Sequence, residues 1–421
     1  MAAFLAPHHA ASEIVTAWYG GIFDILTFAF QMILILVTGY ALALSKPVRA
    51  VLATVASLAR TPRSAIVLAF VVSAIACWLN WGFGLVVAGL LAREISRRVR
   101  VDFGWLVAAS YAGFIVWASG LSSSIALAQA TPGSALNIVQ KLTGTVLPLR
   151  ATVFTPFNLI PVVMLIALLP AVFIAMEPEE SYVTAEALDG PSTSAGSKDA
   201  AYAQDDTLRE KTLAGALEHA WILNVLLVAA GAVYLGITWS SSGISLDINS
   251  LIFIFFLLGL LLHWRPIAYV QAINAAARVT GPLIIQYPLY GGIMGIMTAT
   301  GLAGVIAQWF LTFSSSATLP FFNYLASVAI SLFVPSGGGH WAVQGPFAVA
   351  AALHVHASQA ATAMGVAMGE QVADMIQPFW FLPVLAITGM GLRRVMAFTV
   401  AAFLIGFSVF GLSLLFLIPR T

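Results

Sequence analysis

A polar, glycine-rich break separates two apolar runs at Val334-Pro335-Ser336-Gly337-Gly338-Gly339-His340-Trp341-Ala342-Val343-Gln344-Gly345-Pro346-Phe347. It falls where an uninterrupted membrane helix would be expected. Glycines let backbone amides come close to a ligand, and a helix that starts here would point its positive amino end at an anion. We therefore interpret the stretch as half of a buried anion site. An ordinary glycine kink or an extramembrane loop is the alternative, against which His340, Trp341 and the apolar flanks argue.

The composition indicates an all-α membrane protein with several spans, because 60% of the 421 residues are hydrophobic and only 8% are charged. With about 20 residues a crossing, the chain has room for roughly ten membrane elements. Cys77 is the only cysteine, which excludes a disulfide framework and a cysteine-based metal site. No Lys or Arg precedes Lys46, so the first apolar segment lacks the basic part of a cleavable signal peptide and is expected to remain as a span.

A re-entrant helical hairpin, which enters and leaves the membrane on one side, is predicted at 65–92. Asn80-Trp81-Gly82-Phe83-Gly84 splits this apolar region, which is too short for two crossings of about 20 residues each. Basic residues such as Arg63 and Arg93 flank both of its ends, so both ends are expected on the same side of the membrane. One long span with a glycine kink is the alternative.

A membrane helix broken at mid-depth is predicted at 103–130. The run Ser119-Gly120-Leu121-Ser122-Ser123-Ser124 interrupts its apolar sequence. In the alternative, the helix is intact and its serines bond back to its own carbonyl groups.

The breaks divide the chain into two similar units joined by a linker. The first unit, 21–176, contains a span at 21–43, a surface helix, the hairpin 65–92 and the broken helix 103–130. An acidic cytoplasmic linker is predicted at 177–213, followed by scaffold spans within 214–281. The second unit, 282–418, contains a span at 282–301, a second hairpin at 320–352, a second broken helix at 360–387, interrupted at Gln377-Pro378, and a last span.

The two units are predicted to be inverted repeats, with about eight full spans and two hairpins in all. Threading the spans in order places the two hairpins on opposite sides of the membrane. All Lys and Arg residues except Lys141, Arg150 and Arg420 then lie inside, as the positive-inside rule requires. Inverted repeats with broken helices place a binding site near the bilayer midplane and are typical of secondary transporters.

The chain also resembles the short-chain fatty acid transporter family of bacterial inner membranes. The resemblance is carried by the stretch from Val334 to Pro346, by Gly369-Glu370-Gln371-Val372-Ala373-Asp374-Met375-Ile376-Gln377-Pro378-Phe379-Trp380 and by the 80–84 tip. It implies short monocarboxylates such as butyrate or acetoacetate as substrates. It also implies a homodimer that works by elevator-like movement.

The negative charge of a carboxylate bound at mid-depth has to be balanced without an arginine, because the predicted topology leaves every Lys and Arg near a membrane edge. Helix amino ends, backbone amides and polar or aromatic side chains of the four breaks remain. The candidate substrate-binding residues are Asn80, Trp81, Gly82, Gly84, Ser119, Ser122, Ser123, Ser336, Gly337, Gly338, Gly339, His340, Trp341, Gln344 and Gln377. His340 could donate to the substrate, carry a proton or only orient the tip.

Glu370 and Asp374 are the candidate ion-coupling residues. Their i, i+4 spacing places them on one helix face just before the Gln377-Pro378 break. Carboxylates inside a membrane are costly and are functional by default, so one of them could carry a proton or bind sodium. In the alternative, Glu370 or Asp374 lies at the outer mouth and is solvated.

The sequence therefore predicts a secondary transporter that imports short-chain monocarboxylates together with Na⁺ or H⁺, in the bilayer and as a homodimer. No resident cofactor, metal site or nucleic-acid partner is expected. A passive anion channel is the first alternative and could use the same helix ends. An intramembrane enzyme with His340 and Ser336 is the second, but no Asp adjacent in sequence would orient the imidazole.

Overall fold

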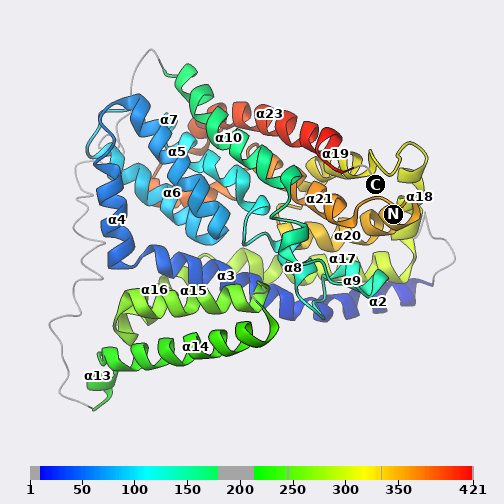
Figure 1. Ribbon diagram of the computed structural model, residues 1–421, viewed down its shortest axis with the longest axis horizontal. Helices are drawn as coiled ribbons and strands as arrows, with labels where there is room; N and C mark the ends of the chain where they lie inside the picture. Colours follow the sequence, from blue (N-terminus) through cyan, green and yellow to red (C-terminus); the bar gives the residue numbers. More distant parts are fainter. Residues whose placement is uncertain (1–9, 179–212, 244–245, 333, 420–421) are drawn as a thin grey trace.

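The computed structural model of the chain describes residues 10–178, 213–243, 246–332 and 334–419, and every regular element in these ranges is a helix (Figure 1). Six of the described helices or joined helix pairs are long and apolar enough to cross a membrane. The predicted all-α, multi-span fold class is thus confirmed. The predicted acidic linker 177–213 lies almost entirely outside the described residues.

The first half contains a long span, a short helix, two packed helices and an interrupted helix. Its elements are α2 (Ala11–Asp24), α3 (Leu26–Ala43), α4 (Lys46–Ala56), α5 (Pro62–Leu79), α6 (Trp81–Ser96), α7 (Phe103–Ala112), the 3₁₀ helix η1 (Gly113–Ser119), α8 (Ser124–Ala130), α9 (Ile138–Thr143), the 3₁₀ helix η2 (Leu149–Ala151) and α10 (Pro156–Ala175). The first span begins at Ala11, ten residues before the predicted start at 21, because the apolar pattern already starts there.

The second half also consists of helices throughout its described residues. Its elements are α13 (Leu213–Glu218), α14 (Trp221–Ser242), α15 (Ile248–His263), α16 (Pro266–Ala277), α17 (Gly281–Ala299), α18 (Leu302–Leu311), α19 (Leu319–Ser331), α20 (Gly337–His354), α21 (Gln359–Ala373), α22 (Phe381–Thr388) and α23 (Leu392–Phe416). The first scaffold span starts at Trp221 rather than at 214, because the short helix α13 precedes it.

Local sequence explains why α5 and α6 fold back on each other. Thr61 caps α5, and Asn80 ends α5 and caps α6 by accepting a hydrogen bond from the amide of Phe83 at 2.9 Å. Gly84 lets the two helices approach, because a Cβ at this position would lie 2.5 Å from the backbone of Cys77. The polar residue and the glycine are both needed to turn the chain inside an apolar environment.

The four breaks in the helices fall at the predicted positions. α5 ends and α6 begins around Asn80, and η1 ends at Ser119 before α8 starts at Ser124. α20 begins at Gly337, and α21 ends at Ala373 before α22 starts at Phe381. Each break leaves backbone groups without a partner inside a helix, so each is a place where a ligand or a side chain can bond.

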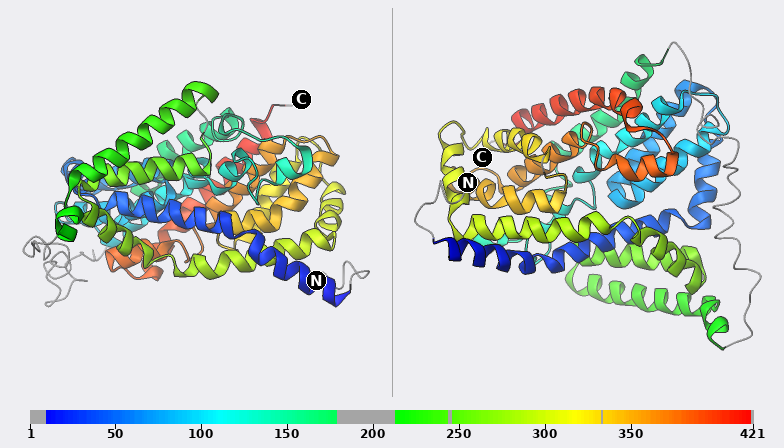
Figure 2. Two further views of the ribbon diagram at one scale, coloured as in Figure 1. Left: turned by 90° about the horizontal axis from the view of Figure 1, so that it is seen from below. Right: turned by 180° about the vertical axis from the view of Figure 1, so that it is seen from behind.

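Glycines let α2 and α17 pack closely along one edge of the molecule (Figure 1). A Cβ at Gly21 would lie 3.0 Å from Gly295, and Gly291 is equally close to α2. α3 continues α2 and packs on α15 and α16, while α14 lies outside them, as the two further views in Figure 2 also show. These helices form a layer beside the hairpin helices and the broken helices.

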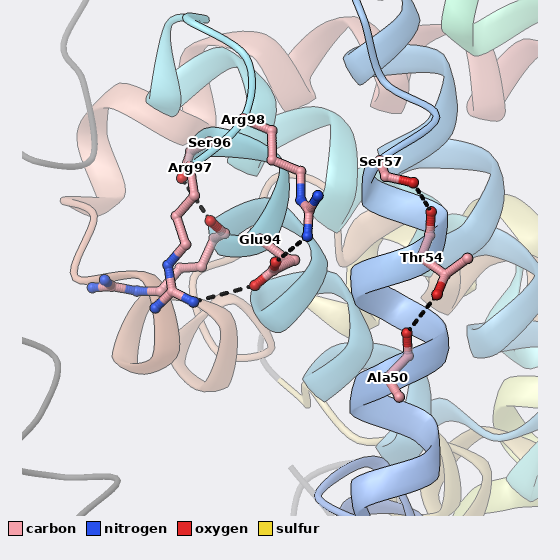
Figure 3. A network of polar contacts seen from close by, with 8 residues as sticks. Ala50, Thr54, Ser57, Glu94, Ser96, Arg97 and Arg98 are labelled. Carbon is pink, nitrogen blue, oxygen red and sulfur yellow. Dashed lines mark hydrogen bonds and ion pairs between the residues drawn. The ribbon is translucent and has the colours of Figure 1, made fainter.

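Basic residues at the end of α6 have two different roles. Glu94 pairs with Arg97 at 3.2 Å and with Arg98 at 3.0 Å on the exposed surface, near α4, where Ser57 and Thr54 bond back to the backbone (Figure 3). Such exposed pairs contribute little stability. Arg93 instead donates to the carbonyl groups of residues 387 and 388, at 2.7 and 2.9 Å, and so ties α6 to the carboxyl end of α22.

Candidate functional site

The tip of α6 is joined to the break between η1 and α8. The amide of Trp81 donates to the hydroxyl of Ser122 at 2.8 Å, and the amide of Leu121 donates to the carbonyl of Trp78 at 2.7 Å. The Ser122 and Asn80 side chains thus accept from two amides at the amino end of α6, and the Leu121 amide occupies a carbonyl group at the end of α5. The first tip is therefore closed by the protein's own groups.

The amino end of α20 contacts the same break but is not capped. Among the described residues no side chain caps this helix, whose first N–H groups have no acceptor within the helix itself. A Cβ at Gly337 would collide with the hydroxyl of Ser124 and would lie 2.6 Å from the ring of Trp117. Only glycine leaves these amides close to the break, and the amino end of α20 is the uncapped one of the two tips.

Tryptophans from three breaks form one wall of the site. The ring of Trp81 lies 6.4 Å from that of Trp117 and 5.2 Å from that of Trp380, both in edge-on geometry. Phe114 stacks on Trp117 at 5.5 Å. The buried indole nitrogens of Trp81 and Trp380 have no hydrogen-bond partner among the described residues. The wall therefore offers apolar ring surface with two unused donors.

Asp374 is fully buried and its carboxylate is fully engaged. Trp117 donates its indole N–H to Oδ2 at 2.8 Å, and Gln377 donates its amide to Oδ1 at 2.6 Å. Tyr111 donates to the backbone carbonyl of Asp374 at 2.9 Å. These bonds hold the break after α21 against η1, the corresponding break of the first half.

A second pair of hydrogen bonds joins η1 and α21. The side-chain oxygen of Gln371 accepts from the amide of Ser119 at 3.0 Å, and the Gln371 amide donates to the Ser119 hydroxyl at 2.8 Å. Asn158 on α10 donates to the carbonyl of Ser119 at 2.9 Å. Ser119 thus serves to fix the two breaks to each other.

Glu370 is the least satisfied group of the site. Its side chain is 0% exposed, and neither carboxylate oxygen has a hydrogen-bond partner among the described residues. A Cβ at Gly337 would lie 3.1 Å from Oε2, so the carboxyl group faces the amino end of α20. The hydroxyl of Ser124, at the same place, also lacks a partner. The alternative in which Glu370 is solvated at an outer mouth is wrong, because α19 and α21 pack together and bury it.

A cavity of about 270 Å³ adjoins the site beside Gly82 and Trp380. Its wall is almost entirely apolar, and Arg278 lies at its rim. Arg278 follows the last residue of α16, which packs along α3. The placement of every Lys and Arg near a membrane edge stays a prediction, and Arg278 is the basic residue that lines this cavity.

Comparison with known proteins assigns the chain to a family, because the model for short chain fatty acid transporters matches residues 1–417. The protein belongs to the short-chain fatty acid transporter family. An Escherichia coli (strain K12) relative is 39% identical over 98% of this chain and 92% of its own length. A Haemophilus influenzae relative is 36% identical over 96% and 90%. Both names give short-chain fatty acid transport as a provisional function. The predicted family and the prediction that the chain is not an enzyme are confirmed.

Two solved structures share the transporter's fold at low sequence identity. The YdaH transporter of Alcanivorax borkumensis aligns with a TM-score of 0.57 and 12% identity, covering 96% of this chain and 88% of its own. Neisseria gonorrhoeae MtrF, described as illuminating a class of antimetabolite efflux pumps, aligns with a TM-score of 0.50 and 14% identity over 96% and 83%. At this identity the likeness concerns the fold only.

The structure places the candidate residues of the transporter in two groups. Asn80, Ser122, Ser123, Ser119 and Gln377 bond to other protein groups that fix the breaks. Gly82 packs on Leu36, Gly338 on Phe28 and Gly339 on Tyr290, so their missing side chains allow close packing of the tips. Trp341 is buried away from the breaks and donates to the carbonyl of Leu136 at 2.9 Å.

His340 faces the partner helix of its own hairpin. Its Nδ1 accepts from the hydroxyl of Ser331 at 2.9 Å, and its Nε2 donates to the side-chain oxygen of Gln344 at 2.6 Å. Gln344 in turn donates to the carbonyl of Asn323 at 2.8 Å. Of the three roles considered for His340, this geometry favours the one that orients the tip.

Replacing His340 by Ala should therefore lower stability and leave ion coupling intact. Removing the ring leaves buried partners on α19 and α20 without a bond, which costs about 1–3 kcal/mol. We expect a lower unfolding temperature of the detergent-solubilised transporter and an unchanged accumulation ratio of substrate in liposomes at a given gradient. An unchanged unfolding temperature with a collapsed accumulation ratio would instead make His340 a coupling residue.

Several residues of the site were not among the candidates, including Trp117, Ser124, Gln371 and Trp380. Ser124 belongs to the serine run and Gln371 and Trp380 to the second motif, so position in a break could have selected them. No sequence signal marks Trp117, which lies in an apolar run seven residues before Ser124 and acts through a contact between the two halves.

Proposed function

We propose that the protein imports short-chain monocarboxylates, such as butyrate or acetoacetate, together with Na⁺ or H⁺ across a bacterial inner membrane. One observation carries the proposal. Glu370 is completely buried without a hydrogen-bond partner in the described part of the chain, and it faces the uncapped amino end of α20. A membrane protein keeps an unpaired buried carboxyl group at a cost of several kcal/mol, so a group at this place has a use.

The open tip of α20 fits the carboxylate of the substrate. The free amides of Gly337 to Gly339 and the positive end of the helix attract one negative charge. The hydroxyl of Ser124 supplies a further donor, and the indole wall of Trp81 and Trp380 accommodates a short acyl chain. The substrate class follows from the family, and the site contains the groups that such a substrate needs.

Coupling follows because the charged carboxylate of Glu370 and the carboxylate of the substrate compete for one position at the amino end of α20. A charged Glu370 and a substrate carboxylate at the tip of α20 would repel each other across a short, desolvated distance. The substrate can therefore bind only when a proton or a sodium ion neutralises Glu370. In the substrate-free form the charged carboxylate of Glu370 can itself lie at the positive amino end of α20. Asp374, whose oxygens already accept two bonds, then serves mainly to hold the break in place.

Matching contacts in the two halves support an inverted repeat with two re-entrant hairpins. α3 packs on α6 as α17 packs on α20, and α5 packs on η1 as α19 packs on α21. The helix that follows each broken helix packs against the other half of the chain: α22 packs on α6, and α8 packs on α20. An exchange of this kind is expected when two units face each other across a central site.

The layered arrangement supports an elevator-like movement of hairpins and broken helices against a scaffold. The bonds of Arg93, Gln371 and Trp117 link the hairpin helices and broken helices of both halves into one unit. α2, α3 and α14 to α17 form the adjoining layer. Only 11% of the α14 span is buried within the chain, which leaves an apolar face for lipid and for the second subunit of the proposed homodimer.

A counterflow assay in liposomes tests the substrate class. The purified protein is reconstituted with unlabelled butyrate inside and labelled butyrate outside, and acetate, acetoacetate, hexanoate and butyramide are compared as competitors. We expect the short carboxylates to compete and the uncharged butyramide to fail. Competition by butyramide equal to that of butyrate would contradict recognition of the carboxylate.

A further inference from the structure

Arg278 lies where the long scaffold segment of the second half is broken. It ends α16, and α17 starts three residues later after the N-cap Thr280. α16 packs along α3 and α15, and its 12 residues span roughly 18 Å at the usual helical rise. Arg278 is thus about one helix length away from Arg265 at the other end of α16, and it lines a cavity.

The cavity next to Arg278 leads to the candidate site. Its lining includes Gly82 at the tip of α6 and Trp380 of the aromatic wall. Between these residues and Arg278, the wall consists mainly of apolar side chains such as Leu85, Val279 and Leu283. A cavity with one cation at its rim and hydrocarbon on its walls complements a molecule with one carboxylate and a short alkyl chain.

We propose that this cavity is a second binding site for the transported monocarboxylate, in which Arg278 holds the carboxylate and the apolar wall holds the alkyl chain. The volume of about 270 Å³ is below the range of roughly 300–1,000 Å³ that drug-sized ligands need, which suits a small acid. The predicted topology places Arg278 on the cytoplasmic side of the tips, so the cavity is the release site during import. This inference rests on the proposed function.

Replacing Arg278 by Gln tests the site, because only the cytoplasmic half-saturation constant should change. A charge-assisted bond to a carboxylate is lost, which weakens binding by about tenfold or more. In right-side-out membrane vesicles loaded with butyrate, the internal concentration for half-maximal efflux should rise by that factor. The external concentration for half-maximal uptake should stay the same. A general loss of folding would lower the maximal rates in both directions and leave both constants unchanged, and R278K should restore the efflux constant.

Arg265→Gln is the matched control, since it removes the same charge at the opposite end of α16, outside this cavity. A second variant, Val279→Trp, fills the apolar part of the cavity. We expect it to impair efflux of hexanoate more than efflux of acetate. The proposal is overturned if R278Q leaves the efflux constant unchanged in vesicles whose wild-type transporter carries butyrate. It is also overturned if R278Q only removes a co-purified phospholipid, detected by mass spectrometry. Absence of any wild-type butyrate transport would count against the proposed function instead.

Discussion

Replacing Glu370 by Gln should abolish gradient-driven accumulation of butyrate while leaving exchange of butyrate for butyrate. The amide has nearly the same shape and remains neutral at every pH, so the charge that excludes the substrate from the tip of α20 is gone. The substrate then binds without a cation. In proteoliposomes with an imposed proton or sodium gradient, we expect internal butyrate to stop at the external concentration, whereas counterflow proceeds at a rate similar to that of the wild type.

Asp374→Asn is the variant to compare with Glu370→Gln. The carboxylate of Asp374 accepts hydrogen bonds from Trp117 and Gln377. The Asn side chain has one acceptor oxygen fewer, so the substitution should disturb the break after α21 and slow both uptake and exchange. Loss of exchange together with accumulation in E370Q would show that Glu370 is needed for binding or folding and not for coupling. Unchanged accumulation in E370Q would remove Glu370 from the coupling mechanism altogether.

Replacing Gly337 by Ala should reduce uptake about 10–100-fold, since overpacking of a well-packed site costs about 1–3 kcal/mol. The added methyl group collides with the hydroxyl of Ser124 and lies 2.6 Å from the ring of Trp117. It also covers the amide donors that the substrate needs. Initial rates of labelled butyrate uptake in proteoliposomes with equal amounts of protein measure the effect.

Gly236→Ala is the matched control for this prediction. Gly236 lies in α14, also in a membrane helix, and a Cβ there would meet nothing within 4 Å, so uptake should be unchanged. In a Ser124→Ala background the colliding hydroxyl is gone, so adding G337A should reduce uptake by a smaller factor there than it does in the wild type. Wild-type rates in G337A would show that the tip of α20 is not the place where substrate binds.

Much of the fold was predictable because the signals are local. The asparagine, glycine, serine and proline breaks interrupt otherwise apolar runs, and an interruption at membrane depth has few physical explanations. The four breaks were therefore placed correctly at Asn80, the serine run, Gly337 and Gln377-Pro378. The predicted starts of the first span and of the first scaffold span were wrong, because apolar sequence extends beyond the first start to Ala11 and already begins before Trp221.

The site itself was only partly predictable, because its decisive features depend on contacts between the two halves. The sequence marks Glu370 and Asp374 equally, yet packing leaves Glu370 without a partner and gives Asp374 two. His340 looked like a site residue since it follows the glycines, but its ring turns to α19. Arg278 was assigned to the membrane edge from the predicted topology, and only the three-dimensional arrangement shows that it lines a cavity together with Gly82.

The most direct test of the account is uphill transport by the wild-type protein in liposomes of defined content. Labelled butyrate is supplied outside at equal concentration in three samples, with an inward proton gradient, an inward sodium gradient or neither. The account predicts that one of the two gradients drives internal butyrate at least several-fold above the external concentration, and that collapsing the gradient with an ionophore releases it. Equilibration to the external concentration under all three conditions, with rapid flux in each, would contradict coupling and leave a passive anion pathway.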